Sequence, residues 1–252
     1  MANDWPQGYG YLPLDTVDST LDEAARRFDG LAGPTWITAK TQTKARGRRG
    51  RAWANPTGNF AGTLVLPRLD DPATAALRSF VTAVALDETF VALTGRAEAF
   101  ALKWPNDVLL NGGKVAGILL ESVTRQGRLA GLSIGIGVNL AHAPEAASLE
   151  PGALPPVSLG EALGVAITPE DFLEVLAPAF ARREAQFTTY GFGPIREAWL
   201  ARAARIGAVV TARLPSEEIT GTFRTVDEAG QLVLSTPGGD RRIAAGDVFF
   251  QG

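Results

Sequence analysis

The sequence predicts an α+β fold in which long helices cover a sheet and a small β-barrel follows. Residues 73–94 carry an apolar stripe at helical spacing, and residues 169–190 begin with a helix-capping pattern, Thr-Pro-Glu-Asp. Between these helices, residues 97–140 contain β-rich stretches separated by tight-turn signals, which predicts an antiparallel meander. From residue 207 onward, short β-rich stretches with small turns indicate a β-barrel of SH3-like size.

The region before the first long helix predicts three strands and one short helix. Ser19 and Thr20, together with Asp18, offer side-chain oxygens that cap a helix N-terminus. Apolar residues follow at helical spacing as far as Phe28, and Gly30 ends the helix. The predicted strands of this region are 11–17, 35–41 and 59–66.

The rest of the chain supplies the remaining elements. Asn111-Gly112-Gly113 and Gln126-Gly127 mark the turns of the meander, and residues 143–156, rich in alanine and proline, predict a surface loop. A domain boundary near Ile206 gives a large domain of residues 1–205 and a C-terminal domain of residues 206–252. The predicted strands are 97–104, 108–110, 114–123, 129–140, 208–214, 219–226, 232–235 and 241–244, and the shorter predicted helices are 158–163 and 193–203.

The composition excludes several kinds of chemistry. The chain has no cysteine and a single histidine, His142, which rules out disulfides, thiolate catalysis and multi-histidine metal sites. Its formal net charge of -3 is unlike that of a protein whose main task is to hold nucleic acid. No run approaches the ~20 apolar residues of a membrane span, and the first ten residues lack a signal-peptide core, so we expect a cytoplasmic protein.

Residues 44–53, called the basic loop below, concentrate positive charge in this acidic chain. Five lysines and arginines fall within eight residues, interrupted by Gly47 and Gly50 and followed by Trp53. Arginine forks match the oxygens of carboxylates and phosphates, and glycine lets the backbone approach a ligand closely. Two readings stay open from this stretch alone: a site for a small anionic ligand, or a solvated basic loop.

A second charged motif surrounds the first hairpin of the meander. Lys103 and Asp107 flank Trp104-Pro105-Asn106, and Lys114 begins the strand that returns after the Asn-Gly turn. If residues 108–110 pair with 115–117, Lys103 and Lys114 converge on one face of the hairpin. The alternative is that both lysines only solubilise strand ends.

The two motifs together make the chain resemble the biotin protein ligases over nearly its whole length. The resemblance implies a mixed sheet covered by helices, followed by an SH3-like β-barrel. It also implies the form without the N-terminal DNA-binding domain that some members carry, because the matching motifs begin within twenty residues of Met1. The matching motifs are Asp18-Ser19-Thr20, Arg46-Gly47-Arg48-Arg49-Gly50-Arg51 with Trp53, Lys103-Trp104-Pro105-Asn106-Asp107, Lys114-Val115-Ala116-Gly117-Ile118-Leu119 and Gly135-Ile136-Gly137-Val138-Asn139.

This resemblance implies an ATP-dependent ligase, of the biotin–[acetyl-CoA-carboxylase] ligase type. Biotin and MgATP give biotinyl-5′-AMP, and a lysine of the biotin carboxyl carrier domain of a carboxylase then takes the biotinyl group. No enzyme nucleophile is required, which suits a chain without cysteine. The implied substrates are biotin and ATP with Mg²⁺ as activating ion, with no tightly bound prosthetic group, no metal held by the protein alone, and a monomer or homodimer as the assembly.

The roles of individual residues follow from the resemblance motif by motif. Lys114, Arg48, Asp107 and Lys103 are the implied catalytic residues: Lys114 holds the reacting oxygens, Lys103 adds charge near the phosphates, and Asp107 orients or deprotonates the acceptor lysine or helps to hold Mg²⁺. Trp53 is expected near the adenine, and the glycine-rich strand around Gly135 and Gly137 is expected to leave room for biotin. The implied binding residues for biotin and its adenylate are Ser19, Thr20, Gln42, Arg46, Gly47, Arg48, Trp53, Lys114, Gly117, Gly135, Gly137 and Asn139.

Two positions depart from the family pattern. Ala45 stands where glycine is usual, and an added Cβ restricts positive φ angles. Leu21 stands where asparagine is frequent. Three alternatives remain: a lipoate ligase of the same superfamily, a biotin-binding protein without transfer activity, and a nucleic-acid-binding protein that uses the basic loop and Trp53.

Overall fold

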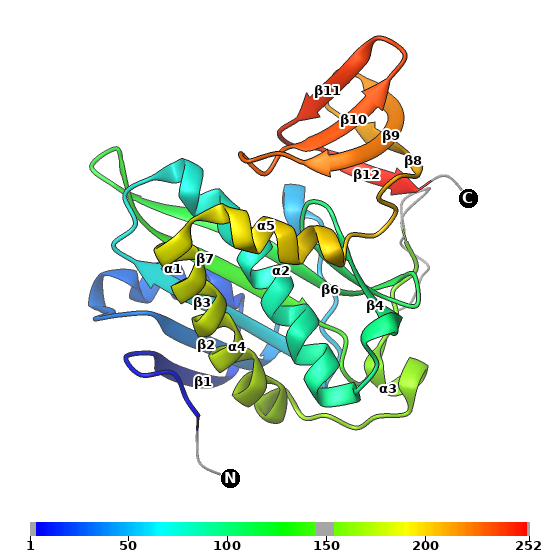
Figure 1. Ribbon diagram of the computed structural model, residues 1–252. Helices are drawn as coiled ribbons and strands as arrows, with labels where there is room; N and C mark the ends of the chain where they lie inside the picture. The colour runs from blue at the N-terminus through cyan, green and yellow to red at the C-terminus, as the bar shows by residue number, and fades with distance from the viewer. Residues whose placement is uncertain (1–3, 145–153, 251–252) are drawn as a thin grey trace.

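A computed structural model describes residues 4–144 and 154–250 of the chain (Figure 1). Its larger unit is built on a seven-stranded sheet of order β1-β2-β3-β7-β6-β5-β4. β1 and β2 run parallel and every other neighbouring pair runs antiparallel, so the sheet is mixed. The strands are β1 (Gly10–Val17), β2 (Thr35–Gln42), β3 (Phe60–Pro67), β4 (Phe100–Lys103), β5 (Asp107–Leu110), β6 (Gly113–Arg125) and β7 (Arg128–Val138).

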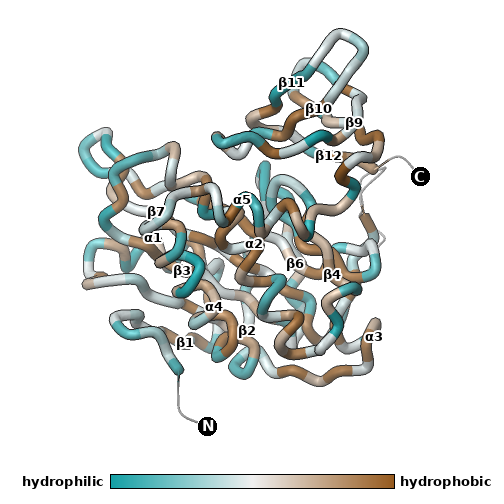
Figure 2. The backbone as a smooth tube through the Cα atoms, in the orientation of Figure 1, coloured by the Kyte–Doolittle hydropathy of each residue, from teal (hydrophilic) through white to brown (hydrophobic). Residues whose placement is uncertain are grey.

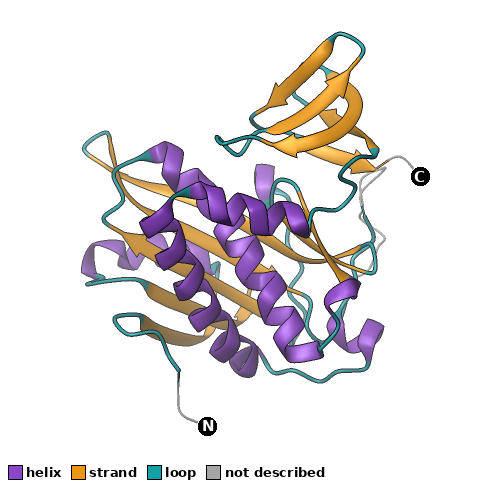
Figure 3. Cartoon of the chain, viewed as in Figure 1, coloured by secondary structure: helices purple, strands orange, loops and turns teal. Residues whose placement is uncertain are grey.

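The long helices lie together on one side of this sheet (Figures 1 and 3). α2 and α4 pack on each other, and both contact strands of the sheet. Hydrophobic residues run along much of α2 (Figure 2). Phe90 of α2 and Phe172 of α4 contact each other, and Phe172 also contacts Phe60 of β3, so aromatic rings join the helix layer to the sheet. The helices are α1 (Thr20–Arg27), α2 (Pro72–Thr94), α3 (Leu159–Leu163), α4 (Pro169–Tyr190) and α5 (Phe192–Ala201). None of the helices in the described residues is long and apolar enough to cross a membrane.

The C-terminal unit is a five-stranded antiparallel sheet of order β11-β10-β9-β8-β12. The fold class predicted from the sequence is therefore confirmed. The indole nitrogen of Trp104 donates to the carbonyl oxygen of Gly230 at 3.0 Å, which ties the β9–β10 turn to the larger unit. The division at residues 205 and 206 stays a prediction. The strands are β8 (Val209–Arg213), β9 (Glu218–Val226), β10 (Leu232–Thr236), β11 (Gly239–Ile243) and β12 (Asp247–Phe250).

Three elements differ from those predicted. Ala97–Ala99 form a 3-10 turn rather than the start of a strand, because β5 ends at Leu110 and leaves these residues without a partner to pair with. β12 was not predicted: a four-residue stretch carries little signal of its own, and it forms because β8 supplies its pairing partner. The predicted loop at 143–156 is described at its two ends only, and there Lys114 pairs with Pro156 in a β-bridge.

Candidate functional site

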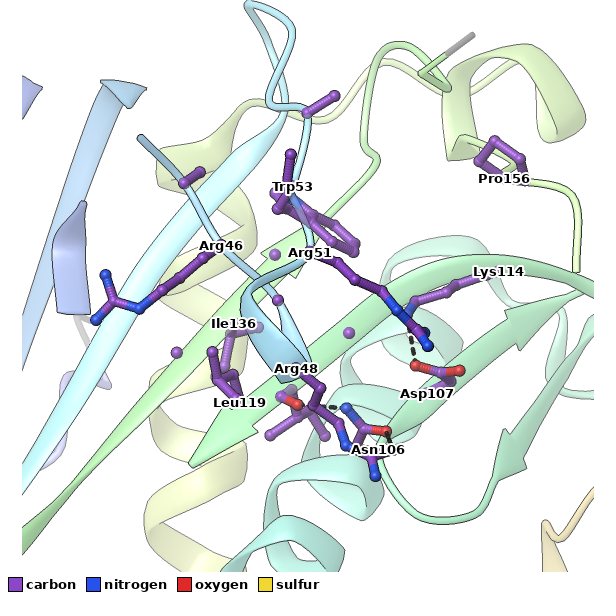
Figure 4. A pocket seen from close by; sticks show the side chains of 18 of the residues that line it. Arg46, Arg48, Arg51, Trp53, Asn106, Asp107, Lys114, Leu119, Ile136 and Pro156 are labelled. Atoms are coloured by element: carbon purple, nitrogen blue, oxygen red, sulfur yellow. Dashed lines mark hydrogen bonds and ion pairs between the residues drawn. The ribbon is translucent and has the colours of Figure 1, made fainter. Parts of the chain in front are cut away.

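One cavity of about 530 Å³ collects the residues singled out in the sequence (Figure 4). It lies where the C-terminal end of β1, the basic loop, the β4–β5 hairpin and the centres of β6 and β7 meet, and β12 of the C-terminal unit closes one side. All of the candidate residues line it: Ser19, Thr20, Gln42, Arg46, Gly47, Arg48, Trp53, Lys103, Asp107, Lys114, Gly117, Gly135, Gly137 and Asn139.

One end of the cavity lies at the N-terminus of α1 and is formed by Ser19, Thr20 and Gln42, called the polar floor below. The Ser19 hydroxyl caps the helix by accepting from the Leu21 backbone N–H at 3.2 Å. The Gln42 carbonyl oxygen accepts from the backbone N–H of Thr20 at 2.8 Å and from its hydroxyl at 3.2 Å. Thr63 of β3, fully buried, donates to the Thr20 hydroxyl at 2.8 Å. Gln42 is thereby oriented, and its NH₂ group, which has no partner among the described residues, is available to a ligand.

The basic loop is a small hairpin rather than an irregular loop. The backbone N–H of Gly47 donates to the Arg51 carbonyl oxygen at 2.7 Å, and that of Trp53 donates to the Ala45 carbonyl oxygen at 3.1 Å. Arg49 and Gly50 form its tip with φ angles of 56° and 72°, the conformation of a type I′ turn. Ala45 is not among the described residues with a positive φ, so its Cβ causes no backbone strain in this hairpin.

The arginines of the hairpin point in different directions. Arg48 faces the β4–β5 hairpin, where it donates to the Asn106 side-chain oxygen at 3.2 Å and to the Gly246 carbonyl oxygen at 3.0 Å. Arg46 points away from Lys114 and Asp107 (Figure 4) and bonds Glu121 of β6 and Asp22 of α1 instead. These two carboxylates raise the pKa of Arg46 above its usual value. The role of Arg46 toward a ligand stays a prediction, and in this conformation it anchors the hairpin base.

Asp107 lies between the two lysines of the second motif. Lys114 Nζ is 2.6 Å from one carboxylate oxygen, and Lys103 Nζ is 3.4 Å from the other. Burial favours the neutral acid, but Lys114 and Lys103 outweigh burial and hold the pKa of Asp107 below its usual value. Burial lowers the pKa of Lys103, although Asp107 opposes the shift. The predicted convergence of the lysines on one face therefore occurs, and the hairpin register that produces it pairs Val108 with Ala116.

The glycines of β6 and β7 make room for this chain's own side chains. A Cβ on Gly137 would lie 2.5 Å from the Trp53 indole, and one on Gly117 would lie 3.2 Å from it. A Cβ on Gly135 would lie 2.9 Å from Leu21. The indole thus rests on the backbone of Gly137, with Lys114 Nζ 5.4 Å from the ring centre.

Asn139 offers an unused acceptor at the other end of the cavity. Its side-chain nitrogen donates to the carbonyl oxygens of Val157 at 3.1 Å and of Lys114 at 3.4 Å. This fixes the amide orientation, and the buried Oδ1 atom is left without a hydrogen-bond partner. A group that gained access to this buried oxygen would have to be a hydrogen-bond donor.

Three site residues were missed in the sequence. Thr63 lies in the middle of β3, whose sequence predicts only a buried strand, and Asp247 lies on β12, which was not predicted. Asn106 was part of the second motif without a role; its side-chain nitrogen bonds the Ile118 carbonyl oxygen at 2.6 Å, which presents its oxygen to Arg48. The Asn106 signal was present in the motif, whereas no local pattern marks Thr63 or Asp247.

Comparison with known proteins agrees with this geometry. Residues 11–139 match the model of the biotin/lipoate A/B protein ligase family, and residues 206–251 match that of the biotin protein ligase C terminal domain. The chain belongs to the biotin/lipoate A/B protein ligase family. The two matches correspond to the larger unit and the C-terminal unit of the structure.

Among its relatives in the family is a biotin–[acetyl-CoA-carboxylase] ligase of Paracoccus denitrificans, 53% identical, with 95% of this chain and all of the relative covered. A Mycobacterium tuberculosis protein of the same name is 31% identical over 96% of this chain and 90% of the relative. The solved biotin protein ligase of Aquifex aeolicus in complex with biotin and ATP is 25% identical, with a TM-score of 0.81 and coverage of 95% and 97% of the two chains.

Proposed function

We propose that this protein is a biotin protein ligase, which activates biotin as biotinyl-5′-AMP and transfers it to a lysine of a carboxylase carrier domain. The family membership and the similarity to ligases from end to end support this activity. The observation that carries the proposal is the cavity, which joins a polar floor to a cluster of cations beside a buried carboxylate. Such a cavity suits a ligand that has a polar ring at one end and anionic groups further along.

The polar floor matches the ureido ring of biotin. That ring presents one carbonyl oxygen and two N–H groups, so it needs both donors and acceptors. The oriented NH₂ group of Gln42 can donate to the ureido oxygen, and the hydroxyl groups of Ser19 and Thr20 can serve either role. Leu21, which packs against Gly135, adds apolar surface beside the floor.

In the first step, a biotin carboxylate oxygen attacks the α-phosphorus of ATP, and the bond from that phosphorus to pyrophosphate breaks. Both reactants are anions, so the cavity must reduce their repulsion and align them. Lys114, Lys103 and Arg48, which all line the cavity, can supply that charge. Closure of the basic loop over the product excludes water, which would hydrolyse the mixed anhydride.

In the second step, the neutral acceptor amine attacks the acyl carbon, the bond from this carbon to the phosphate oxygen breaks, AMP leaves, and the amine proton passes to solvent. We assign the contact with the incoming amine to Asp107, a carboxylate that lines the cavity. Its lowered pKa makes it a weak proton acceptor, which favours an orienting role over general-base catalysis.

The nucleotide is assigned to Asn139 and Trp53. ATP carries hydrogen-bond donors only on its adenine amino group and ribose hydroxyls, so the unpartnered Oδ1 of Asn139 favours a nucleoside contact over a phosphate contact. The indole of Trp53, which lies against Gly137, offers an aromatic surface for stacking in the same cavity.

The cavity fits a Mg²⁺ ion that is bound mainly through the phosphates of ATP. Asp107 and Asp247 are the carboxylates among the described cavity-lining residues, and both are already paired with lysines or arginines. No group of three metal-ligating side chains occurs in the described part of the chain. Mg²⁺ commonly binds through substrate phosphates and water, where it neutralises phosphate charge.

A mass-gain assay tests the function and separates it from its alternatives. The purified protein is incubated with MgATP, a carboxylase carrier domain, and either biotin or lipoate. With biotin, we expect the acceptor to gain the mass of one biotinyl group. With lipoate, we expect no gain in mass. Gain with lipoate alone identifies a lipoate ligase, and no gain with either contradicts the proposal. Biotin binding without any adenylate identifies a non-catalytic binding protein.

Gly137→Ala is expected to raise the KM for MgATP by about tenfold, since a misplacement near 1 Å has large effects in a reactive site. The new methyl group would overlap the Trp53 indole and push it off the strand. Biotinyl-5′-AMP formation at varied MgATP measures the change. Gly193→Ala is the matched control, because a Cβ there meets no atom within 4 Å. An unchanged KM would contradict the role given to the Trp53 position.

A further inference from the structure

The cavity holds two amines of its own beside the carboxylate assigned to the acceptor amine. Lys114 Nζ lies 2.6 Å from one oxygen of Asp107, and Lys103 Nζ lies 3.4 Å from the other. The proposed function brings an amine-reactive mixed anhydride into this same cavity. A lysine amine with a free electron pair would attack its acyl carbon and block the site. The site must therefore keep two lysines unreactive where a third, from the acceptor, has to react.

Among the described cations of the cavity lining, only the lysines can become nucleophiles. Arg46, Arg48 and Arg51 also line the cavity, and guanidinium groups keep their proton in proteins. A lysine ammonium loses its proton more readily, and burial promotes this loss because it disfavours the charged form. The risk of self-acylation therefore depends on what holds the two lysines in their charged form.

Lys103 depends on Asp107 more than Lys114 does. The Lys114 side chain is 31% exposed, so water also solvates its charge, and its Nζ lies 5.4 Å from the centre of the Trp53 ring. The Lys103 side chain is only 11% exposed. Burial lowers the pKa of Lys103, and the Asp107 carboxylate opposes this shift. Of the other charges that act on Lys103, Lys114 adds to the shift and Asp247 opposes it.

The sheet fixes this arrangement. Lys103 ends β4, Asp107 begins β5, and the two residues are directly opposed in the antiparallel pair. Opposed residues of an antiparallel pair have neighbouring side chains. Lys103 is therefore held beside Asp107 by paired strands rather than by a loop, and it stays in the cavity whatever its charge.

We propose that Asp107 also protects the protein against self-acylation, by holding Lys103 as a paired ammonium while the mixed anhydride is present. This proposal rests on the proposed function. In the reaction that Asp107 prevents, the neutral Lys103 amine attacks the acyl carbon of biotinyl-5′-AMP. An amide bond forms, the bond from the acyl carbon to the phosphate oxygen breaks, AMP leaves, and the amine proton passes to solvent. Because an amide is stable, each such event removes one protein molecule from turnover.

Treatment with biotinyl-5′-AMP, followed by peptide mass mapping, tests the proposal without requiring the variant to make adenylate. The chain has four lysines to follow: Lys40, Lys44, Lys103 and Lys114. Lys40, 71% exposed on β2, is the internal reference for adenylate that reacts from solution. Asp107→Asn keeps the size of the side chain and removes its charge. We expect it to raise the ratio of Lys103 label to Lys40 label at pH 7 by about tenfold, which corresponds to roughly 1.4 kcal/mol lost by the charged amine.

Two further variants serve as controls for this measurement. Asp240→Asn breaks an exposed pair with Arg224 in the C-terminal unit, and it should leave the ratio as in the parent protein. Adding Lys103→Arg to Asp107→Asn should remove the extra label, because arginine keeps its proton. An unchanged ratio in folded Asp107→Asn, or extra label on Lys114 instead of Lys103, overturns the proposal.

A pH series on the parent protein decides the matter if Asp107→Asn loses its fold. Burial lowers the pKa of Lys103, whereas the hydrogen bond with Asp15 raises that of Lys40. Lys103 therefore becomes neutral first, and its label relative to Lys40 should rise between pH 7 and about 9.5. A flat ratio overturns the proposal. Adenylate formation from biotin and MgATP is measured separately: if none forms, the proposed function fails, and added biotinyl-5′-AMP still decides whether Asp107 protects Lys103.

Discussion

Lys114→Ala is expected to remove biotinyl-5′-AMP formation and to leave the fold intact. Lys114 Nζ is the cation that faces Asp107 at 2.6 Å and lies beside the Trp53 indole, and we propose that the carboxylate and the α-phosphate meet beside it. Loss of one preorganised charge-stabilising group costs on the order of 10²–10³ in rate, and Lys114 bears on both reactants. The side chain is 31% exposed, so its removal leaves no large cavity in the core.

Adenylate formation is measured directly, by the amount of biotinyl-5′-AMP made in a single turnover without acceptor. Lys40→Ala provides the control, since Lys40 lies on β2 with a side chain 71% exposed and pairs only with surface Asp15 in the described structure. Near-normal adenylate formation by Lys114→Ala would refute the role assigned to this lysine. Unchanged thermal unfolding of the variant is needed for the loss to be assigned to chemistry.

Asp107→Asn is expected to destabilise the protein by about 3 kcal/mol at pH 7 and to abolish biotin transfer. Removing one partner of a buried ion pair leaves a buried charge without compensation, which costs roughly 3–5 kcal/mol. The uncompensated charge is Lys103, whose side chain is only 11% exposed. Denaturant unfolding measures the change, and Asp15→Asn, at a carboxylate that is 87% exposed, should lie within about 0.5 kcal/mol of the parent.

The pH dependence of this variant has a definite sign. The pKa of Lys103 is lowered in the folded protein, so between its folded pKa and 10.5 the unfolded chain binds more protons. Stability therefore rises with pH in that window, and without Asp107 the window extends to lower pH. Asp107→Asn should thus lose less stability at pH 9.5 than at pH 7. An equal loss at both pH values would show that Lys103 is not the group left uncompensated.

The parent protein should likewise lose stability as the pH falls through the acid range. The pKa of Asp107 is held below 3.8 in the folded protein, so its contribution is fully present above that value. It is lost as the pH falls through the lower folded pKa. Comparing acid unfolding of the parent protein with that of Asp107→Asn isolates this contribution, and the difference between them should shrink below pH 3.8.

The sequence predicts those parts of the site in which neighbouring residues act together. The Asn-Gly turn sets the β5–β6 hairpin, which brings Lys114 near Asp107, and the pairing of β4 with β5 brings Lys103 to Asp107. The capping pattern at Ser19 likewise places the polar floor at the start of α1. In each case, the turn or cap is local and the chemistry follows from it.

The sequence does not predict partners that meet only through tertiary packing. Arg46 bonds Glu121, 75 residues away, and Arg49 bonds Asp247, 198 residues away. No periodicity or turn signal connects such positions, so the directions of the loop arginines had to come from the structure. The sequence also does not predict the neighbour of Gly137. That neighbour is Trp53, the last residue of the basic loop, and the two meet only in the folded chain.

The position of Asp247 has a consequence for the smallest piece of this chain that can work as a ligase. A fragment of residues 1–205 contains every side chain proposed to touch biotin, ATP or the acceptor lysine. It lacks the carboxylate that gathers three of its arginines, as well as the Phe250 ring beside Lys103. We therefore expect chimaeras between relatives to keep their activity best when residues 44–53 and 246–250 come from the same parent.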